Sequence, residues 1–439
     1  MSIRILDKKL VSQIAAGEVV ERPASVVKEL VENSLDAGSS QISVEVKGGG
    51  VSLIRVTDNG AGIPAGEVEL AFERYATSKI ASPEDLQSIR SLGFRGEALP
   101  SIAAVAQIEM ATCATGESEG TFLGLEDGLV IKRKSQGRPH GTTITVRNLF
   151  RKVPARLKFL KSVSTENSHI ANVVSQYALA FPEVGFNVLI DGRKVLRTTG
   201  RGQLMDSIIE IYGVETAQSM LEVKSTESGW KGVTGSPEVT GMIGSPVVGR
   251  SSRNYLSFFI NRRWVSSRLL AWAVEEAYHG LLMTGKHPVA VINISLPYEE
   301  VDVNVHPTKS EVKFQNEHKI FITVQKAVRE ALVGKMPVPK IEEVATAYAS
   351  PREQSQILWP SPLASNSSSA GSLSGAIQPQ LAKTLPVLRI LGQLAGSYII
   401  AEGPDGLYLI DQHAAHERVL FEQIMGQRLR HEVEVQGLL

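Results

Sequence analysis

The sequence predicts an α+β fold, in which helices pack on an antiparallel or mixed sheet. Residues 23–37 carry apolar side chains at helical spacing, whereas residues 41–47 alternate between polar and apolar as a strand does. Three glycines at 48–50 then indicate a turn, and residues 51–57 return as a second strand. Helices and strands mixed in this way favour a sheet covered by helices.

The first helix is predicted to end at Ala37, because Gly38 stands where a helix C-cap glycine belongs. Its apolar residues lie three or four positions apart and define one face: Val26, Val27, Leu30, Val31 and Leu35. A further strand is expected over 142–146, where another apolar stretch occurs.

A second αβ region is predicted to begin near Gly202. Its expected elements are strands at 255–260 and 289–296, a helix at 267–279 and a last helix near 319–332. The composition then changes to one rich in Pro, Ser, Ala and Gln. Such a stretch buries too little apolar surface to offset its ordering entropy, so it indicates a flexible, disordered linker.

Structured patterns resume after this linker, with strands expected at 387–394, 397–401 and 407–410 and a helix from His413 onward. The chain ends at Leu439, roughly fifty residues into this part, which is short for an autonomous domain. We therefore expect a truncated domain here. The predicted division is 1–201, 202–333, the linker 334–386, and the beginning of a C-terminal domain at 387–439.

The overall composition excludes some classes of protein. A chain of 439 residues is long enough for two or three domains, and it has no run of about 18 apolar residues that would predict a membrane span. Lys and Arg number 46, as do Asp and Glu, so only the distribution of charge can indicate a nucleic-acid partner. Cys113 is the single cysteine, which excludes an internal disulfide and fits a reducing cytoplasm.

Two polar residues of the first helix can serve a nucleotide. Glu29 and Asn33 are four apart, so they project from the same helix face. A carboxylate there can orient or deprotonate a water, and an amide oxygen one turn away can join a Mg²⁺ shell. For this pair alone, two solvent-facing polar residues of an amphipathic helix is the simpler interpretation.

Asp58 ends an apolar strand and is followed by Gly60 and Gly62. A carboxylate fixed at a strand end can accept a hydrogen bond from the exocyclic amine of adenine, and the glycines let backbone approach a ligand. An ordinary turn is one alternative. Another is a dinucleotide fingerprint over 60–65, which needs a parallel βαβ unit, whereas the strand before it is expected to close a hairpin.

Gly93 and Gly96 precede an apolar helical pattern, so backbone N–H groups at that helix start can form an anion site suited to phosphates. Arg95 can add charge. The chain contains no Walker A sequence, so phosphate binding has to use this other design.

Together these segments resemble the MutL family of mismatch-repair ATPases, within the superfamily of gyrase, HSP90 and histidine kinases. The likeness covers roughly residues 1–330 and a piece near the end. It rests on Gln13-Ile-Ala-Ala-Gly-Glu-Val-Val-Glu-Arg-Pro, Ala76-Thr-Ser-Lys79-Ile, Gly93-Phe-Arg-Gly-Glu-Ala-Leu99, Pro154-Ala-Arg and Asp302-Val-Asn-Val-His-Pro-Thr-Lys309. It implies a GHKL (Bergerat-type) ATPase α/β sandwich followed by a smaller αβ transducer domain.

The resemblance also implies roles at matching positions. Glu29 would be the general base, Asn33 the Mg²⁺ ligand and Asp58 the adenine reader of an ATP site. Lys79 would approach the phosphates, Lys309 would reach the γ-phosphate from the second domain, and Thr142 and Thr143 would lie on the strand that floors the pocket. The lid that wraps the phosphates would comprise Gly93, Phe94, Arg95, Gly96, Glu97, Ala98 and Leu99.

DNA is the partner that the resemblance implies, bound through phosphates with little sequence preference. The expected contacts are Lys158 and Lys161 in one basic stretch, and Arg262, Arg263 and Arg268 in another. A solvated charged surface is the alternative for each stretch. Arg151 and Lys152 stand where many family members have Tyr-Asn, so local contacts there can differ.

A second candidate site follows Asp411, in the run Asp411-Gln-His413-Ala-Ala-His416-Glu417. Asp, His and Glu at these spacings can bind Zn²⁺ or Mn²⁺. The run resembles the endonuclease motif of nicking MutL proteins, which would make Asp411, His413, Glu417 and Glu422 ligands. The family's further nuclease motifs do not occur in this chain, so nicking is expected only of a longer parent. A charged amphipathic helix is the alternative.

The resulting hypothesis is a slow, Mg²⁺-dependent ATPase that acts as a conformational switch in bacterial mismatch repair. Implied partners are a mismatch-sensing MutS-type protein, a downstream nuclease, helicase or sliding clamp, and a second copy of the chain in an ATP-dependent homodimer. The implied location is the cytoplasm, with the nucleoid. A DNA-binding scaffold that barely hydrolyses ATP is the second hypothesis; a chaperone or topoisomerase subunit is the third.

Overall fold

The hairpin that the sequence predicts lies in the middle of the first sheet. In the computed structural model, β1 (Gln41–Lys47) pairs antiparallel with β2 (Leu53–Asp58). Gly48–Gly50 forms the turn, and its three glycines have φ values of 59°, 66° and 83°, a region that favours glycine. A dinucleotide-binding unit would need these strands to be parallel, so the alternative interpretation of residues 60–65 is excluded.

The structure describes residues 20–80, 82, 91–225, 237–283, 285–302, 312–335, 389–394, 397–403, 406–413, 415 and 416. The chain divides into two units, Met1–Lys335 and Met336–Leu439. Residues 336–386 of the linker predicted at 334–386, and residues 13–19 of the N-terminal motif at 13–23, lie outside the described residues.

Eight strands form the first sheet, in the order β5-β4-β3-β6-β2-β1-β7-β8. Every neighbouring pair is antiparallel except β1 and β7, which are parallel, so the sheet is mixed as predicted. The remaining strands are β3 (Gln107–Cys113), β4 (Gly120–Glu126), β5 (Leu129–Gln136), β6 (Gly141–Arg147), β7 (Gly185–Ile190) and β8 (Arg193–Arg197).

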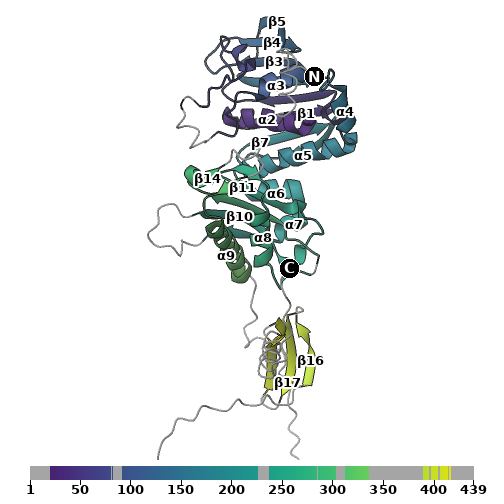
Figure 1. Ribbon diagram of the computed structural model, residues 1–439, viewed down its shortest axis with the longest axis vertical. Helices are drawn as coiled ribbons and strands as arrows, with labels where there is room; N and C mark the ends of the chain where they lie inside the picture. The colour runs from purple at the N-terminus through teal and green to yellow at the C-terminus, as the bar shows by residue number, and fades with distance from the viewer. Residues whose placement is uncertain are drawn as a thin grey trace, which may run out of the picture. The chain divides into compact units, whose positions relative to one another are not determined.

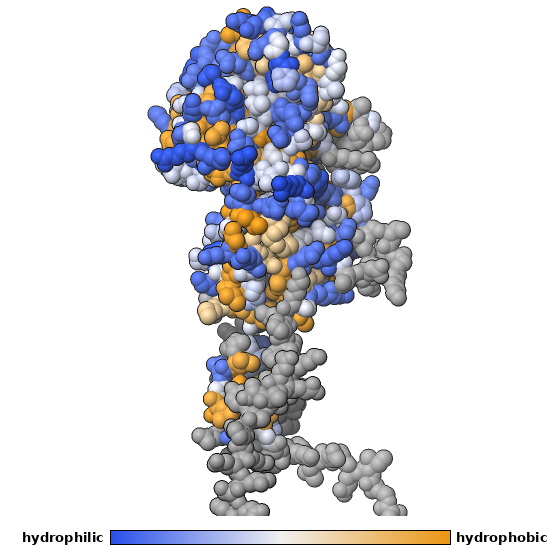
Figure 2. Space-filling view, turned by 180° about the vertical axis from the view of Figure 1, so that it is seen from behind, coloured by the Kyte–Doolittle hydropathy of each residue, from blue (hydrophilic) through white to orange (hydrophobic). Residues whose placement is uncertain are grey.

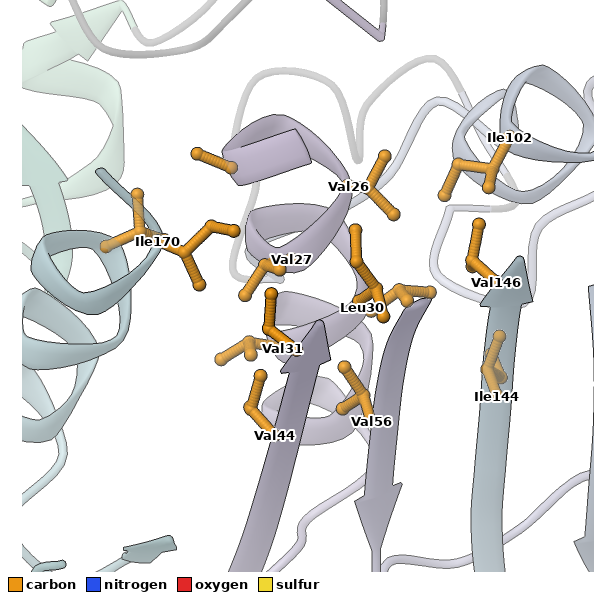
Figure 3. Close-up of a cluster of buried hydrophobic side chains, with 14 of the residues drawn as sticks. Val26, Val27, Leu30, Val31, Val44, Val56, Ile102, Ile144, Val146 and Ile170 are labelled. Atoms are coloured by element: carbon orange, nitrogen blue, oxygen red, sulfur yellow. The ribbon is translucent and has the colours of Figure 1, made fainter. Parts of the chain in front are cut away.

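Helices cover one face of this sheet (Figure 1). They are α2 (Pro23–Asp36), α3 (Ala98–Val105), α4 (Pro154–Phe159) and α5 (Val163–Ala180). Figure 3 shows the apolar face of α2, with Val27, Leu30 and Val31, lying against β1, β2 and α5. Burying each such side chain contributes about 1.5–3 kcal/mol, so the predicted face fixes the rotation of α2.

The second sheet has the order β12-β11-β13-β10-β9, with β11 and β13 parallel and the other pairs antiparallel. Its strands are β9 (Met220–Lys224), β10 (Glu238–Gly244), β11 (Leu256–Ile260), β12 (Arg263–Val265) and β13 (Ala290–Ser295). The helices are α6 (Leu204–Tyr212), α7 (Val214–Gln218), α8 (Arg268–Ala277) and α9 (Glu317–Lys335).

Both faces of the second sheet are covered. Side chains of α8 and α9 form one core with Phe258, Ile260 and Ile292, whereas α6 and α7 form another with Phe259 and Val291. Leu179 and Ala180, at the end of α5, join the second core. This packing connects the two sheets of the first unit through α5.

Smaller elements complete the described chain. A two-stranded sheet pairs β14 (Val301–Asp302) with β15 (Lys313–Phe314), and short 3₁₀ turns lie at Gly48–Gly50, Leu70–Phe72, Pro246–Val248, Arg253–Tyr255 and Tyr298–Glu300. In the second unit, β16 (Arg389–Leu394), β17 (Tyr398–Gly403) and β18 (Gly406–Asp411) form an antiparallel sheet. The three strands predicted there are confirmed.

The surface in Figure 2 is mostly hydrophilic over the upper part of the first unit, with hydrophobic patches farther down that unit. Within the described ranges, none of the helices combines the length and the hydrophobicity that a bilayer crossing requires.

Candidate active site

A cavity of about 920 Å³ opens beside α2 in the first unit. Most of the predicted nucleotide residues line it: Glu29, Asn33, Asp58, Gly62, Lys79, Gly93, Phe94, Arg95, Gly96, Glu97, Ala98 and Leu99. Since these residues come from segments up to seventy positions apart, the fold brings together what the sequence shows only in order. Gly60 and Thr143 are not in the lining.

Glu29 and Asn33 reach the cavity because α2 buries its other side. Val26, Val27 and Leu30 are at most 1% exposed, so the residues between them face outward from the core. The side chain of Glu29 is 17% exposed, and its Oε1 lies 3.6 Å from Lys28 Nζ. The arrangement leaves a carboxylate and an amide oxygen one turn apart on the cavity wall, as predicted from their spacing.

Asp58 is 9% exposed and fixed by three contacts at the end of β2. Its Oδ1 accepts from the backbone N–H of Gly60 at 2.9 Å and of Thr142 at 3.2 Å, while Ser34 Oγ lies 3.0 Å from Oδ2. These hydrogen bonds hold the carboxylate in one orientation. Such a fixed acceptor suits recognition of a donor on a ligand.

The two glycines after Asp58 have different reasons to be glycine. Gly62 lines the cavity with φ of +73°, and a Cβ there would come within 2.0 Å of the Cys113 carbonyl oxygen. Gly60 lies away from the lining, and its Cβ would meet Ser39 Oγ at 2.6 Å and the Ala37 carbonyl at 2.8 Å. Gly60 is therefore required by packing against the end of α2.

The alternation of side chains along β6 decides which of two adjacent threonines faces the cavity. Thr142 lines it, and its hydroxyl lies 2.9 Å from Thr112 Oγ1. The next residue, Thr143, points to the opposite face, where its hydroxyl lies 3.2 Å from Thr57 Oγ1. The prediction that Thr143 contributes to the pocket is not met, because adjacent strand residues alternate between faces.

Lys79 is held by two residues of α2. Its Nζ donates to Asp36 Oδ2 at 2.6 Å and to Asn33 Oδ1 at 2.9 Å. Asp36 also accepts from the backbone N–H groups of Leu92 and Gly93, at 2.9 and 3.0 Å. Sequence reasoning missed Asp36, although its position seven residues after Glu29 places it on the same helix face.

The predicted phosphate loop leads directly into α3, whose first residue is Ala98. Gly96 has φ of +62°, and a Cβ there would lie 2.6 Å from the Ala76 carbonyl oxygen, so this position needs glycine. The Gly96 carbonyl in turn accepts from Tyr75 N at 3.0 Å. The contact fixes the two halves of the cavity rim, around 75–79 and 93–98, to each other.

A buried polar network of Lys28, Glu32 and Tyr177 lies next to Glu29, on the side of α2 that faces α5. Tyr177 Oη donates to Glu32 Oε1 at 2.6 Å, and Lys28 Nζ donates to the same oxygen at 2.8 Å. Burial lowers the pKa of Lys28, but the charges of Glu32 and Glu29 outweigh it and the net pKa is raised. Burial, followed by the same two carboxylates, raises the pKa of Tyr177 well above its ordinary value.

Three family models match the chain in succession. Residues 21–135 match the histidine kinase-, DNA gyrase B-, and HSP90-like ATPase model, 208–333 the DNA mismatch repair protein C-terminal domain, and 391–439 the MutL C terminal dimerisation domain. The DNA mismatch repair protein MutL of Desulforudis audaxviator is 44% identical over 431 residues, covering 96% of this chain and 73% of that protein. The chain belongs to the MutL family of DNA mismatch repair proteins.

Other MutL proteins are similar over the same extent. The MutL of Geobacter sulfurreducens is 40% identical over 473 residues, covering 100% of this chain and 77% of its own. A crystal structure described as the N terminal domain of a DNA repair protein has a TM-score of 0.63 at 25% identity, covering 76% of this chain and 99% of that one. The predicted α+β fold class, with its GHKL ATPase domain and second αβ domain, is confirmed.

Four of the five residues that the MutL resemblance assigns to DNA are exposed. Lys158 lies in the last turn of α4, Lys161 follows that helix, and Arg268 begins α8. Arg262 donates to Glu183 at 2.5 Å, and its guanidinium lies 4.4 Å from the Phe181 ring centroid. Arg263 is the exception and corrects the prediction. It is 6% exposed, because its guanidinium is turned inward onto the Ser91 and Leu92 carbonyls.

Part of the predicted C-terminal metal motif is described. Asp411 ends β18, and its Oδ1 accepts from the backbone N–H of His413 at 2.9 Å. Glu417, Glu422 and, in the first unit, Lys309 lie outside the described residues. Among the residues that are described, no group of three His, Cys, Asp or Glu side chains could hold a metal ion.

Proposed function

We propose that the cavity binds ATP and that Glu29 is the general base that activates the hydrolytic water. The observation that carries the proposal is that four features line one cavity. They are a carboxylate, an amide oxygen, a fixed hydrogen-bond acceptor that suits the amine of adenine, and a glycine-rich helix start. The match of residues 21–135 to an ATPase model supports it. In this assignment Asp58 accepts from the exocyclic amine of adenine, and Gly62 lets the backbone approach the base.

The phosphates would lie at the start of α3, beside the cavity-lining residues 93–99, because the first turn of a helix presents backbone N–H groups that suit an anion. Lys79 lines the same side, and by the family resemblance Lys309 would add a second ammonium. The oxygen donors fit Mg²⁺: Asn33 Oδ1 stands one helical turn from the Glu29 carboxylate, and phosphates and waters supply the remaining ligands. Bound Mg²⁺ would neutralise phosphate charge.

We further propose that ATP serves as a conformational switch in mismatch repair. The domains would be an ATPase domain over 1–201 and a transducer domain over 202–333, a linker at 334–386 and the start of a C-terminal domain at 387–439. The break between β8, which ends at Arg197, and α6, which begins at Leu204, supports the first boundary. DNA would bind through Arg268, Arg262, Lys158 and Lys161, in the cytoplasm.

The partners are proposed from the family. They are DNA, a mismatch-sensing MutS-type protein, a downstream nuclease, helicase or sliding clamp, and a second copy of the chain. The match of residues 391–439 to a dimerisation domain supports the homodimer, as do exposed apolar residues on β16 and β18, where Ile390 is 71% and Leu407 68% exposed. Asp411 and His413, with Glu417 and Glu422, supply donors suited to Zn²⁺ or Mn²⁺.

The test is single-turnover hydrolysis of ATP by the full chain and by Glu29→Ala. We expect the variant to bind ATP with little change and to hydrolyse it about a hundredfold or more slowly, since a positioned base contributes roughly 10²–10⁴-fold. Glu109→Gln, an exposed carboxylate on β3, is the control. Equal rates for Glu29→Ala and the parent would remove the base assignment, and binding without turnover in the parent would favour the scaffold hypothesis.

A further inference from the structure

Arg263 crosses from the second domain to the rim of the nucleotide cavity. It is the first residue of β12, and its Nη1 donates to the Leu92 carbonyl at 3.1 Å and its Nη2 to the Ser91 carbonyl at 2.9 Å. At 6% exposure, this guanidinium is almost fully removed from water. Burying an arginine is costly unless its donors are satisfied, so the two carbonyls are important partners of the charge.

The same short loop is held from the opposite side by α2. Asp36 accepts from the backbone N–H of Leu92 at 2.9 Å and of Gly93 at 3.0 Å. The carbonyls of 91–92 therefore face a cation of the second domain, and the amides of 92–93 face an anion of the first. Hydrogen bonds to charged groups are roughly twice as strong as neutral ones. The two peptide groups between residues 91 and 93 are therefore held firmly, with their carbonyls on Arg263 and their N–H groups on Asp36.

The turn before Arg263 is itself fixed at the domain junction. Asn261 and Arg262 have φ values of 48° and 68°, as in a tight two-residue hairpin between β11 and β12. Asn261 exchanges two hydrogen bonds with the backbone of Leu296, at 2.8 and 2.9 Å. Arg262 contacts Glu183 and Phe181 of the first domain, so Arg263 emerges from an anchored turn.

Arg263 also lies close enough to the residues behind Glu29 to affect them. Burial and the charges of Glu32 and Glu29 have the larger effects on the pKa values of Lys28 and Tyr177, and both values are raised; the positive charge of Arg263 opposes this rise slightly. The guanidinium therefore contacts the phosphate loop directly and acts on the network behind Glu29 only through its charge.

From this geometry we propose that Arg263 is a positioning residue for the phosphate loop and the link by which nucleotide binding is communicated to the second domain. The inference rests on the proposed ATP site. Phosphates attract Lys79 away from Asp36, Asp36 adjusts its hold on the 92–93 amides, and the carbonyls of the same peptides move against Arg263. Because Arg263 is rigidly joined to β11 and β12, the second domain moves with it.

The experiment uses the full chain with Arg263→Gln and Arg263→Lys. Arg263→Gln should raise the KM for ATP about tenfold or more with a smaller effect on kcat, as expected when charged hydrogen bonds to a binding loop are lost. Arg263→Lys keeps the charge but has its N–H donors on one nitrogen, where arginine uses two separate nitrogens for the two carbonyls, so it should recover part of the loss. Arg253→Gln is the matched control, because it removes a two-point arginine contact, to Glu275, elsewhere on the second domain.

A distance measurement separates communication from simple stability. Spin labels on cysteines introduced at the exposed positions Lys194 of β8 and Glu276 of α8 report the separation of the domains, and the native Cys113 is buried. A non-hydrolysable ATP analogue at saturation should shift this distance in the parent, in Arg253→Gln and in Glu29→Ala, and not in Arg263→Gln.

Two outcomes would overturn the inference: an Arg263→Gln chain with parental KM and distance shift, or a parent whose distance does not respond to the analogue. If Arg263→Gln does not fold, the Arg263→Lys variant tests the proposal in its place. A parental KM and a parental distance shift in Arg263→Lys would equally contradict a role for the paired hydrogen bonds to the two carbonyls. Failure of the ATP assignment looks different, because Glu29→Ala would then hydrolyse ATP like the parent whatever Arg263 does.

Discussion

Lys79 Nζ lies 2.6 Å from Asp36 Oδ2, in an ion pair whose side chains are 22% and 11% exposed. The same ammonium donates to Asn33 Oδ1, the proposed Mg²⁺ ligand, at 2.9 Å. One cation therefore contacts both the proposed metal ligand and the carboxylate that supports the phosphate loop. In the proposed site, phosphates at the start of α3 would compete with Asp36 for this ammonium, and ATP binding would then rearrange the pair.

Replacing Lys79 with Met should weaken ATP binding about tenfold, because a phosphate contact is lost and Asp36 is left without its cation. Calorimetric titration of the full chain with a non-hydrolysable ATP analogue measures this. Lys326→Met is the control, since it removes an exposed i,i+4 pair with Glu330 on α9. Equal affinities of the two variants would show that Lys79 does not contact nucleotide.

Asp58→Asn tests recognition of the base. Asparagine keeps an oxygen for the Gly60 and Thr142 N–H groups, but its amide nitrogen cannot accept from the amine of adenine. The variant should bind ATP about tenfold or more weakly. It should also lose the preference for ATP over purine riboside triphosphate, which lacks that amine; a retained preference would place adenine elsewhere.

Much of this site is predictable from local sequence. Glu29 and Asn33 could be paired because helical spacing puts them on one face, and the glycines at 48–50 indicated the hairpin that places Asp58 at a strand end. Asp36 could have been found by the same spacing, since positions 29, 33 and 36 follow the helical repeat. Its role could not, because its partners at 92 and 93 are more than fifty residues away.

Arg263 shows where local reasoning ends. Its sequence context, beside Arg262 and shortly before Arg268, is that of a basic surface, and a charged residue is rarely buried. Only the packing of β12 against the first domain turns its side chain onto the Ser91 and Leu92 carbonyls. Thr143 is a smaller case, because a single residue of strand register separates the cavity from the opposite face.

Gly62→Ala should reduce both stability and nucleotide binding. The position has φ of +73°, and the added methyl would come within 2.0 Å of the Cys113 carbonyl, so backbone on the cavity wall has to shift. Strain of this kind costs roughly 1–3 kcal/mol. Gly66→Ala is the matched control, since its Cβ meets nothing within 4 Å, and thermal unfolding of the two variants compares them. Equal midpoints would contradict the strain argument.

Arg268→Glu should weaken DNA binding and flatten its dependence on salt. Arg268 is exposed at the start of α8, where a phosphate contact would release one counterion. Losing one such contact lowers the slope of log affinity against log salt by about 0.9 for duplex DNA. Lys194→Glu reverses an exposed charge on β8 and controls for net charge. An unchanged slope in Arg268→Glu would exclude this residue from the contact surface.

Tyr177→Phe should change how stability depends on alkaline pH. Burial raises the pKa of Tyr177 well above the ordinary 10.0, so the folded chain keeps a proton that the unfolded chain releases near pH 10. Stability from this group is full below pH 10 and falls as pH rises toward the raised value, by about 1.4 kcal/mol per pH unit.

The variant should therefore be less stable at pH 8, where it lacks the hydrogen bond to Glu32, yet lose less stability between pH 10 and 11 than the parent. Urea unfolding at each pH gives both quantities. Tyr75→Phe alters a residue that is 73% exposed, so it should follow the parental decline. A parental decline in Tyr177→Phe as well would mean that other groups release the proton, and that the network behind Glu29 is not sensitive to this hydroxyl.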